Sequence, residues 1–248
     1  MKKPTISILF LSLFSAAATQ AQTLIGWDVA GITESATSVT YDSGTLGAHI
    51  STTSPSGVLS RGSGAAAPGS PSANTFGASG FNAANLGSAL TNNDYFTFSI
   101  SVASGYQMSL TSVSFKMSET TNGATNAALF SSVGGFSSAG MAIATWATPS
   151  GTTSDQSITL SGGSFSNLTG TVEFRIFAYG GNSSSTDKFR LRNLSGDDLI
   201  IAGSVSAIPE PATYAALLGA ASLAGAFAHR RQKISRPPAR STSPSRAA

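Results

Sequence analysis

The sequence has no cysteine, only two histidines, and few charged residues, which make up 10% of its 248 positions. The absence of cysteine excludes disulfides, thiolate metal sites and a cysteine nucleophile. It does not argue against export, because a domain of this length buries enough apolar surface without covalent cross-links. Glycine, serine, threonine and alanine are abundant, with scattered aromatic and β-branched residues. This composition favours a β-sandwich or barrel over a helical bundle.

The basic residues are concentrated at the two ends of the chain. Lys2 and Lys3 stand at the start, and a second group begins at Arg230. The intervening residues 22–207 carry a net negative charge. The high isoelectric point therefore belongs to the ends, and we expect no nucleic-acid partner.

The N-terminus has the three parts of a secretory signal peptide. Two lysines precede an apolar run over residues 6–18, and small residues follow up to Ala21. We predict a signal peptide over residues 1–21, cut between Ala21 and Gln22, with a cut after Ala18 as the second choice. The partners would be the Sec machinery and signal peptidase. A retained anchor is the alternative, although the run is shorter than the roughly 20 residues that span a bilayer.

The C-terminal region combines prolines, an apolar stretch and a basic cluster. Pro209-Glu210-Pro211 precedes the apolar residues 212–228, and prolines are tolerated beside the first turn of a helix. We predict a single transmembrane helix over residues 212–228, at the lower limit of spanning length. The positive-inside rule would keep the basic residues that follow on the cytoplasmic side. These residues are Arg230, Arg231 and Lys233.

This ordered arrangement resembles the PEP-CTERM sorting signal, here over residues 208–233. The resemblance implies recognition by an exosortase, with Pro209, Glu210 and Pro211 as the processing site. It also implies a Gram-negative host, an intermediate held transiently in the inner membrane, and a final place at the cell surface or in an extracellular matrix. Residues 234–248 are predicted to be a disordered basic tail. A plain membrane anchor without processing is the alternative.

The middle of the chain alternates in the manner of half-buried strands. Phe96, Phe98, Ile100 and Val102 would share one face, opposite polar neighbours. Nine strands are predicted, with a phase slip at Thr111-Ser112 that suggests a β-bulge. The predicted strands cover residues 24–29, 94–102, 108–117, 127–133, 141–147, 156–160, 172–178, 189–193 and 199–205. Without intervening helices they indicate an antiparallel β-sandwich, jelly-roll-like, over residues 22–207. Residues 51–93 are predicted to be a long Gly/Ala/Ser-rich loop, with one short strand as an alternative within it.

Several motifs of this region resemble the jelly-roll-like domains found upstream of such sorting tails. They include Gly26-Trp27-Asp28, the run from Asn93 to Phe98, and the run from Phe130 to Phe136. The runs from Phe174 to Gly180 and from Phe189 to Leu194 belong to the same pattern. The resemblance implies no known activity.

Groups for catalysis or metal binding are scarce, and we predict no catalytic residue, metal or cofactor. His49 stands alone in a polar stretch, which indicates an exposed loop residue rather than a triad member. Asp197-Asp198 indicates a turn, with calcium binding as the alternative. The carboxylates that suit a glycosidase by type only are Asp28, Asp94, Glu119, Asp155 and Glu173. A surface ion pair with Arg175 is the simpler interpretation of Glu173.

Exposed aromatic residues on a sandwich could instead stack on sugar rings. The candidates for a glycan or partner surface are Tyr95, Trp146, Phe177 and Tyr179. Aromatic residues lie on both faces of the strand over residues 172–178, so burial of Phe177 and Tyr179 in a core is favoured. The leading prediction is a non-enzymatic envelope or matrix protein, with extracellular polysaccharide as a candidate partner. The alternatives are a surface carbohydrate-binding module and, more remotely, an extracellular hydrolase.

Overall fold

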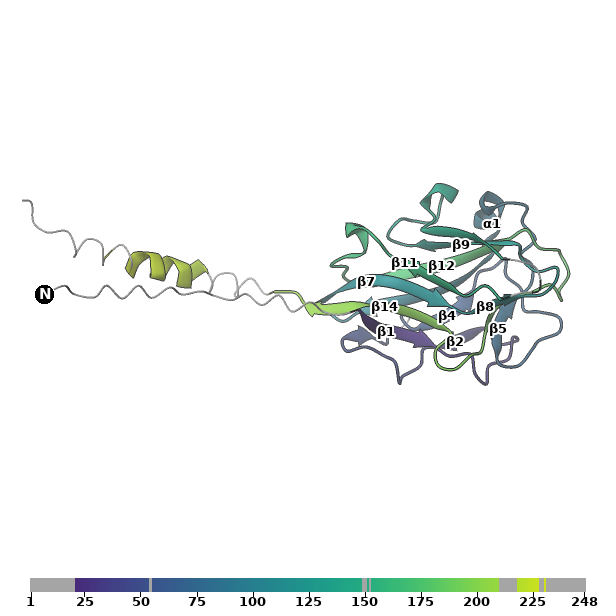
Figure 1. The fold of residues 1–248 in the computed structure, drawn as a ribbon, viewed down its shortest axis with the longest axis horizontal. Helices are drawn as coiled ribbons and strands as arrows, with labels where there is room; N and C mark the ends of the chain where they lie inside the picture. The colour runs from purple at the N-terminus through teal and green to yellow at the C-terminus, as the bar shows by residue number, and fades with distance from the viewer. Residues whose placement is uncertain are drawn as a thin grey trace, which may run out of the picture. The chain divides into compact units, whose positions relative to one another are not determined.

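Strands dominate the computed structural model, which describes residues 21–53, 55–148, 151, 153–209, 218–227 and 230. The chain divides into two units, residues 1–206 and residues 207–248. All nine predicted strands are present in the first unit, and Figure 1 shows the strand-rich fold that they form. They are β1 (Gln22–Trp27), β6 (Tyr95–Val102), β7 (Tyr106–Phe115), β9 (Asn126–Ser131), β10 (Ala144–Ala147), β11 (Gln156–Thr159), β12 (Thr171–Tyr179), β13 (Phe189–Arg192) and β14 (Leu199–Ala207).

The predicted strand over residues 108–117 is divided in the structure. β7 ends at Phe115, and a separate strand, β8 (Met117–Glu119), pairs in another sheet. Within β7 the phase slip is confirmed, because the exposed Thr111 and the half-buried Ser112 both lie between the buried residues Leu110 and Val113.

The predicted long loop over residues 51–93 is wrong. This region contains β4 (Val58–Arg61), β5 (Thr75–Ala78) and the helix α1 (Leu86–Asn92). The prediction failed because short segments of small residues lack the alternation that marks a strand. The short elements β2 (Ser38–Thr40), β3 (Ile50–Ser51), η1 (Ala139–Met141) and η2 (Gly163–Phe165) were likewise not predicted.

Two asparagines define the ends of the unpredicted helix. The Asn85 side chain accepts a hydrogen bond from the Ser88 N–H, which caps the N-terminus. Asn93 has φ 63°, and its N–H donates back to the helix carbonyls, which closes the C-terminus in the left-handed conformation. These caps were the local sequence signal for α1.

The strands form two large sheets and one small one. The first sheet has the order β1-β14-β7-β11, and the second has the order β10-β9-β12-β6-β4-β2, with β3 added beside β6. The small sheet has the order β5-β13-β8. Every strand pairing for which the register is defined is antiparallel. The predicted all-β antiparallel sandwich is confirmed.

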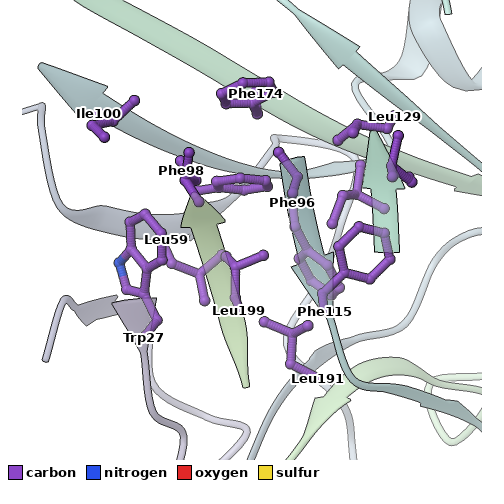
Figure 2. Packing of buried hydrophobic residues seen from close by; sticks show 14 of the residues in the cluster. Trp27, Leu59, Phe96, Phe98, Ile100, Phe115, Leu129, Phe174, Leu191 and Leu199 are labelled. Carbon is purple, nitrogen blue, oxygen red and sulfur yellow. The ribbon is translucent and has the colours of Figure 1, made fainter. Parts of the chain in front are cut away.

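The core lies where the inner faces of the two large sheets meet (Figure 2). Trp27 from β1 meets Phe98 from β6 edge to face, with ring centroids 5.7 Å apart, and Phe98 stacks on Phe174 from β12. The Trp27 indole N–H donates to the Gly57 carbonyl at 3.0 Å, so the one polar atom of this ring is satisfied. Gly57 has φ +76°, and a Cβ there would lie 2.4 Å from the Tyr41 ring, so this approach requires glycine.

The small sheet packs its aromatic side chains against one end of the sandwich. Phe189 from β13 stacks on Phe96 from β6 with centroids 5.8 Å apart, and Phe76 from β5 lies 5.5 Å from the same ring. Phe81 meets both Phe96 and Phe189 edge to face. Aromatic packing therefore joins the three sheets into one core.

A buried charge cluster attaches the loop around Glu34 to the small sheet. The fully buried Glu34 carboxylate pairs with Lys188 at 2.8 Å and Arg190 at 3.5 Å. Burial acts to raise the pKa of Glu34. The hydrogen bonds from Lys188 and the Ser72 N–H and the positive charges of Lys188 and Arg190 act in the opposite direction. They outweigh burial, so the pKa of Glu34 is lowered. Arg61 donates to the Glu34, Ala36 and Gly77 carbonyls in the same region.

In the second unit, the residues described as helical are 218–227 and Arg230. Their side chains are exposed, including the large apolar residues Leu218, Leu223 and Phe227. Among the described residues, no helix has the length and apolar character needed to cross a bilayer. Residues 212–217 and 228 of the predicted membrane helix lie outside the described part.

We predict that Glu34→Gln lowers the free energy of unfolding by about 3 kcal/mol, because it leaves the buried Lys188 ammonium and the half-buried Arg190 without their counter-charge. Urea denaturation followed by tryptophan fluorescence measures this change. The matched control is Asp155→Asn, which removes the exposed Asp155–Arg192 pair (2.7 Å) and should cost less than about 1 kcal/mol. Equal losses in the two variants would contradict a structural role for Glu34.

Candidate functional site

The structure describes only part of the predicted processing sites. Ala21 and Gln22 are exposed, and Gln22 is the first residue of β1. The buried residues of β1 begin at Leu24, so a cut between Ala21 and Gln22 would leave the packed part of the strand intact. In the tail, Pro209 and Arg230 are exposed. The remaining predicted residues of the tail, Glu210, Pro211, Arg231 and Lys233, lie outside the described residues.

The four predicted aromatic residues do not form one exposed surface. Phe177 is buried, which agrees with the favoured prediction of a core position and removes it from the candidate glycan surface. Its ring packs against Phe130 and Tyr95 in a second apolar cluster on the outer face of the seven-stranded sheet. Helix α1 and neighbouring loop residues cover this cluster, so the covering element is a helix and not the four-stranded sheet. Tyr95 and Tyr179 are half-buried at its border.

Trp146 lies apart from the other three aromatic residues. It belongs to the edge strand β10 and packs against the main core, 5.4 Å from the Phe115 ring. Its indole N–H is buried and has no hydrogen-bond partner among the described residues. Trp146 and Tyr95, two of the candidates for a glycan surface, therefore pack against different clusters.

Arg175 marks the border between the covered and open parts of the outer face. Its guanidinium lies between the rings of Tyr95, at 4.4 Å, and Phe136, at 4.1 Å. Its Nε donates to Glu173 Oε1 at 2.7 Å, which confirms the predicted ion pair. The two rings and the carboxylate hold Arg175 in one orientation.

Beside this ion pair the outer face is hollowed. The hollow has a volume of about 270 Å³. It is lined by Pro55, Val58, Ser60, Thr97, Ser99, Thr171 and Glu173. Of these lining residues, only Glu173 was named from the sequence as a candidate site residue. The polar rows of residues 95–101 and 171–175 were the available signal, because neighbouring strands that alternate in this way place their polar side chains on a shared face.

The remaining carboxylates have structural partners in separate places. Asp28 and Asp42 accept hydrogen bonds from the N–H groups of Ala30 and Gly44, two residues onward, which stabilises their own turns. Asp94 is buried beside the end of α1 and accepts from Asn92, and burial raises its pKa. Asp155, directly before β11, pairs with Arg192 of β13 in the small sheet.

Asp197 and Asp198 lie in the turn directly before β14. The Asp198 carboxylate accepts from the Val29 and Leu194 N–H groups at 3.0 and 2.8 Å, which joins this turn to the end of β1. Burial raises the pKa of Asp197, and the nearby charges of Asp42, Asp28 and Asp198 add to this effect. No group of three or more acidic, histidine or cysteine side chains in the described residues is arranged to hold a metal ion.

His49, the one histidine of the domain, is exposed as predicted. Its ring stacks on Tyr106 with centroids 3.7 Å apart.

Glu119 is a buried acid whose pKa lies well above the ordinary value for a glutamate. It lies in β8 and is buried; Oε1 accepts from the Ser154 hydroxyl at 3.0 Å, while Oε2 has no partner among the described residues. Burial raises the pKa of Glu119 to about 7, although Ser154 and the Arg190 charge act to lower it. Glu119 therefore takes up a proton near neutral pH.

The comparisons with known proteins bear mainly on the tail. Residues 207–231 match the PEP-CTERM protein-sorting motif. Among solved structures, one similar chain is described as "Carbohydrate-Binding Module CBM36 in complex with calcium and xylotriose". The identity is 15% and the TM-score 0.25, over 64% of this chain and 90% of that one. No curated protein matches the chain. The fold and the tail together define a β-sandwich protein, and its C-terminal segment carries a PEP-CTERM sorting motif.

We predict that the stability of the domain falls between pH 4.5 and pH 7 because of Glu119. The folded state holds the Glu119 proton more tightly than the unfolded chain, so this contribution is complete below pH 4.5 and is lost as pH rises through about 7. Glu119→Gln should therefore match the wild type at pH 4.5 and exceed its free energy of unfolding at pH 8 by about 3 kcal/mol. Urea denaturation across this pH range measures the difference.

Ser154→Ala provides the companion variant. It removes the hydroxyl that lowers the pKa of Glu119, so the loss of stability should extend to higher pH. A constant difference between Glu119→Gln and the wild type at every pH would contradict the assignment to this carboxyl.

Proposed function

We propose that this protein is an exported cell-envelope or extracellular-matrix protein, sorted by an exosortase through Pro209-Glu210-Pro211. The match of residues 207–231 to the PEP-CTERM sorting motif supports this proposal most directly. The order of the parts agrees with it, because the prolines precede an apolar stretch and the basic cluster follows that stretch.

In this proposal each end of the chain has its own processing enzyme. The Sec machinery exports the chain, and signal peptidase removes residues 1–21. The apolar residues 212–228 then hold the chain in the inner membrane, with Arg230, Arg231 and Lys233 on the cytoplasmic side. An exosortase cleaves near the Pro-Glu-Pro sequence and releases the β-sandwich to the cell surface or the medium of a Gram-negative cell.

The role proposed for the β-sandwich is non-enzymatic and associated with extracellular polysaccharide or biofilm. The engagement of Asp28, Asp94 and Asp155 in turns and pairs supports a non-enzymatic role. The match to the PEP-CTERM sorting motif supports polysaccharide association only through the extracellular-matrix location that the resemblance implies.

We predict that replacing Pro209-Glu210-Pro211 by three alanines retains the chain in the inner membrane. The substitution removes the sequence that the exosortase would recognise but leaves the apolar stretch unchanged. Fractionation of inner membrane, outer membrane and medium, followed by immunoblotting and mass measurement, would detect the retained, uncut chain.

The control for this experiment is the substitution of Pro237 and Pro238 by alanine, beyond the matched residues, which should leave sorting unchanged. An unchanged distribution of the Pro-Glu-Pro variant would count against exosortase sorting. Retention of both variants would indicate a general defect of the tail.

We also predict that the mature protein begins at Gln22. N-terminal sequencing or peptide mass spectrometry of the exported chain tests this. A cut after Ala18 would place Thr19 first, whereas an intact Met1 in exported material would contradict a cleaved signal peptide.

A further inference from the structure

The open half of the outer face of the seven-stranded sheet is built differently from the covered half. On β12, Phe177 lies opposite Tyr95 of β6 and Ala128 of β9, and helix α1 covers this apolar group. Further along β12, Glu173 lies opposite Ser99, and Thr171 lies opposite Ser101. Along β6 and β12 the outer face therefore changes in character. At one end it is apolar and covered by helix α1, and at the other end it is rich in hydroxyl groups and hollowed.

The polar groups of the hollow are fixed by their neighbours. Glu173 Oε1 accepts from Arg175 Nε at 2.7 Å and from the Thr97 hydroxyl at 2.9 Å. The Ser99 hydroxyl donates to the Pro55 carbonyl at 2.5 Å, which holds the loop before β4 over the edge of the hollow. The Thr171 hydroxyl bonds to that of Ser101. These contacts give the hollow a defined shape before any ligand arrives.

Three groups remain available to a ligand. Among the described residues, nothing donates a hydrogen bond to Glu173 Oε2, and the hydroxyl of Ser60 has no hydrogen-bond partner. Thr171 is exposed at the rim, and its hydroxyl, bonded once to Ser101, has a further lone pair for a ligand. Val58 and Pro55 supply an apolar wall. A carboxylate oxygen and hydroxyls beside a small apolar wall are suited to a ring that carries several hydroxyl groups and apolar C–H faces.

The charge of the hollow limits the class of ligand. No lysine or arginine lines it, and Arg175, which contacts the lining residue Glu173, is already paired with that carboxylate. An anionic group such as a phosphate or a uronate would meet the Glu173 carboxylate without a free counter-charge. The volume of about 270 Å³ lies at the lower end of small-molecule sites, which suits one sugar ring of a chain.

We propose that the hollow between β4, β6 and β12 binds one neutral sugar ring of a polysaccharide, with the Glu173 carboxylate accepting from sugar hydroxyls and Ser60 and Thr171 completing the contacts. This site differs from the aromatic surface that the sequence suggested. This proposal rests on the proposed function in one respect: a location at the cell surface would bring polysaccharide to the hollow.

The test is binding of glycans to the full chain, purified in a detergent without a sugar headgroup. An array of neutral and uronate glycans, followed by calorimetry on soluble oligosaccharides, should show binding of neutral glycans. Thr171→Trp places a large ring at the rim and should abolish binding. Glu173→Gln removes a charge-assisted hydrogen bond and should weaken binding about tenfold.

The matched control is Asp155→Asn, which also removes the carboxylate of an exposed ion pair with arginine and lies outside the hollow. It should bind as the wild type does, and urea denaturation confirms that each variant is folded. An array on which no glycan binds, binding that persists in Thr171→Trp, or a preference for uronates would each overturn the proposal. The assay uses purified protein, so a failure of exosortase sorting in cells would not affect it.

Discussion

The pairing of β6 with β12 places apolar side chains on both faces of the same two strands, and the rest of the domain depends on this constraint. On the inner face Phe98 and Phe174 require the four-stranded sheet, which carries Trp27, to exclude water. On the outer face Phe177 requires a separate cover, which helix α1 provides. The helix covers only part of that face. The remaining part keeps its hydroxyl groups and is hollowed, so the position of the hollow follows from where the cover ends.

Strong alternation made much of the fold predictable. Long strands such as β6 and β12 bury large apolar side chains at every second position, and this period is visible in the sequence alone. The elements within residues 51–93 were missed because their packing depends on contacts distant in sequence. In β5, Phe76 is buried against Phe96, but its strand neighbours are small residues without alternation.

The candidate site was less predictable than the fold. The sequence indicates that Phe177 and Tyr179 share a face with Arg175, but which part of that face is covered depends on α1 and on the loop that carries Phe136. The hollow also depends on the Ser99–Pro55 hydrogen bond, which joins residues 44 positions apart. The Glu173–Arg175 pair was predictable because both residues lie two positions apart on one strand.

Among the described residues, β1 is an edge strand that pairs with β14 alone, with Gln22 opposite Gly203. The first strand of the domain therefore pairs with the last, and this sheet cannot be completed until nearly the whole domain has been synthesised and translocated. Closure over so long a segment is slow compared with local pairing. If the chain crosses the membrane from its N-terminus, β1 with Leu24 and Trp27 emerges on the far side before β14, its strand partner, has been translocated. A chain still held at its C-terminal end would have time to complete this closure before release, with little chance to associate with other unfinished copies.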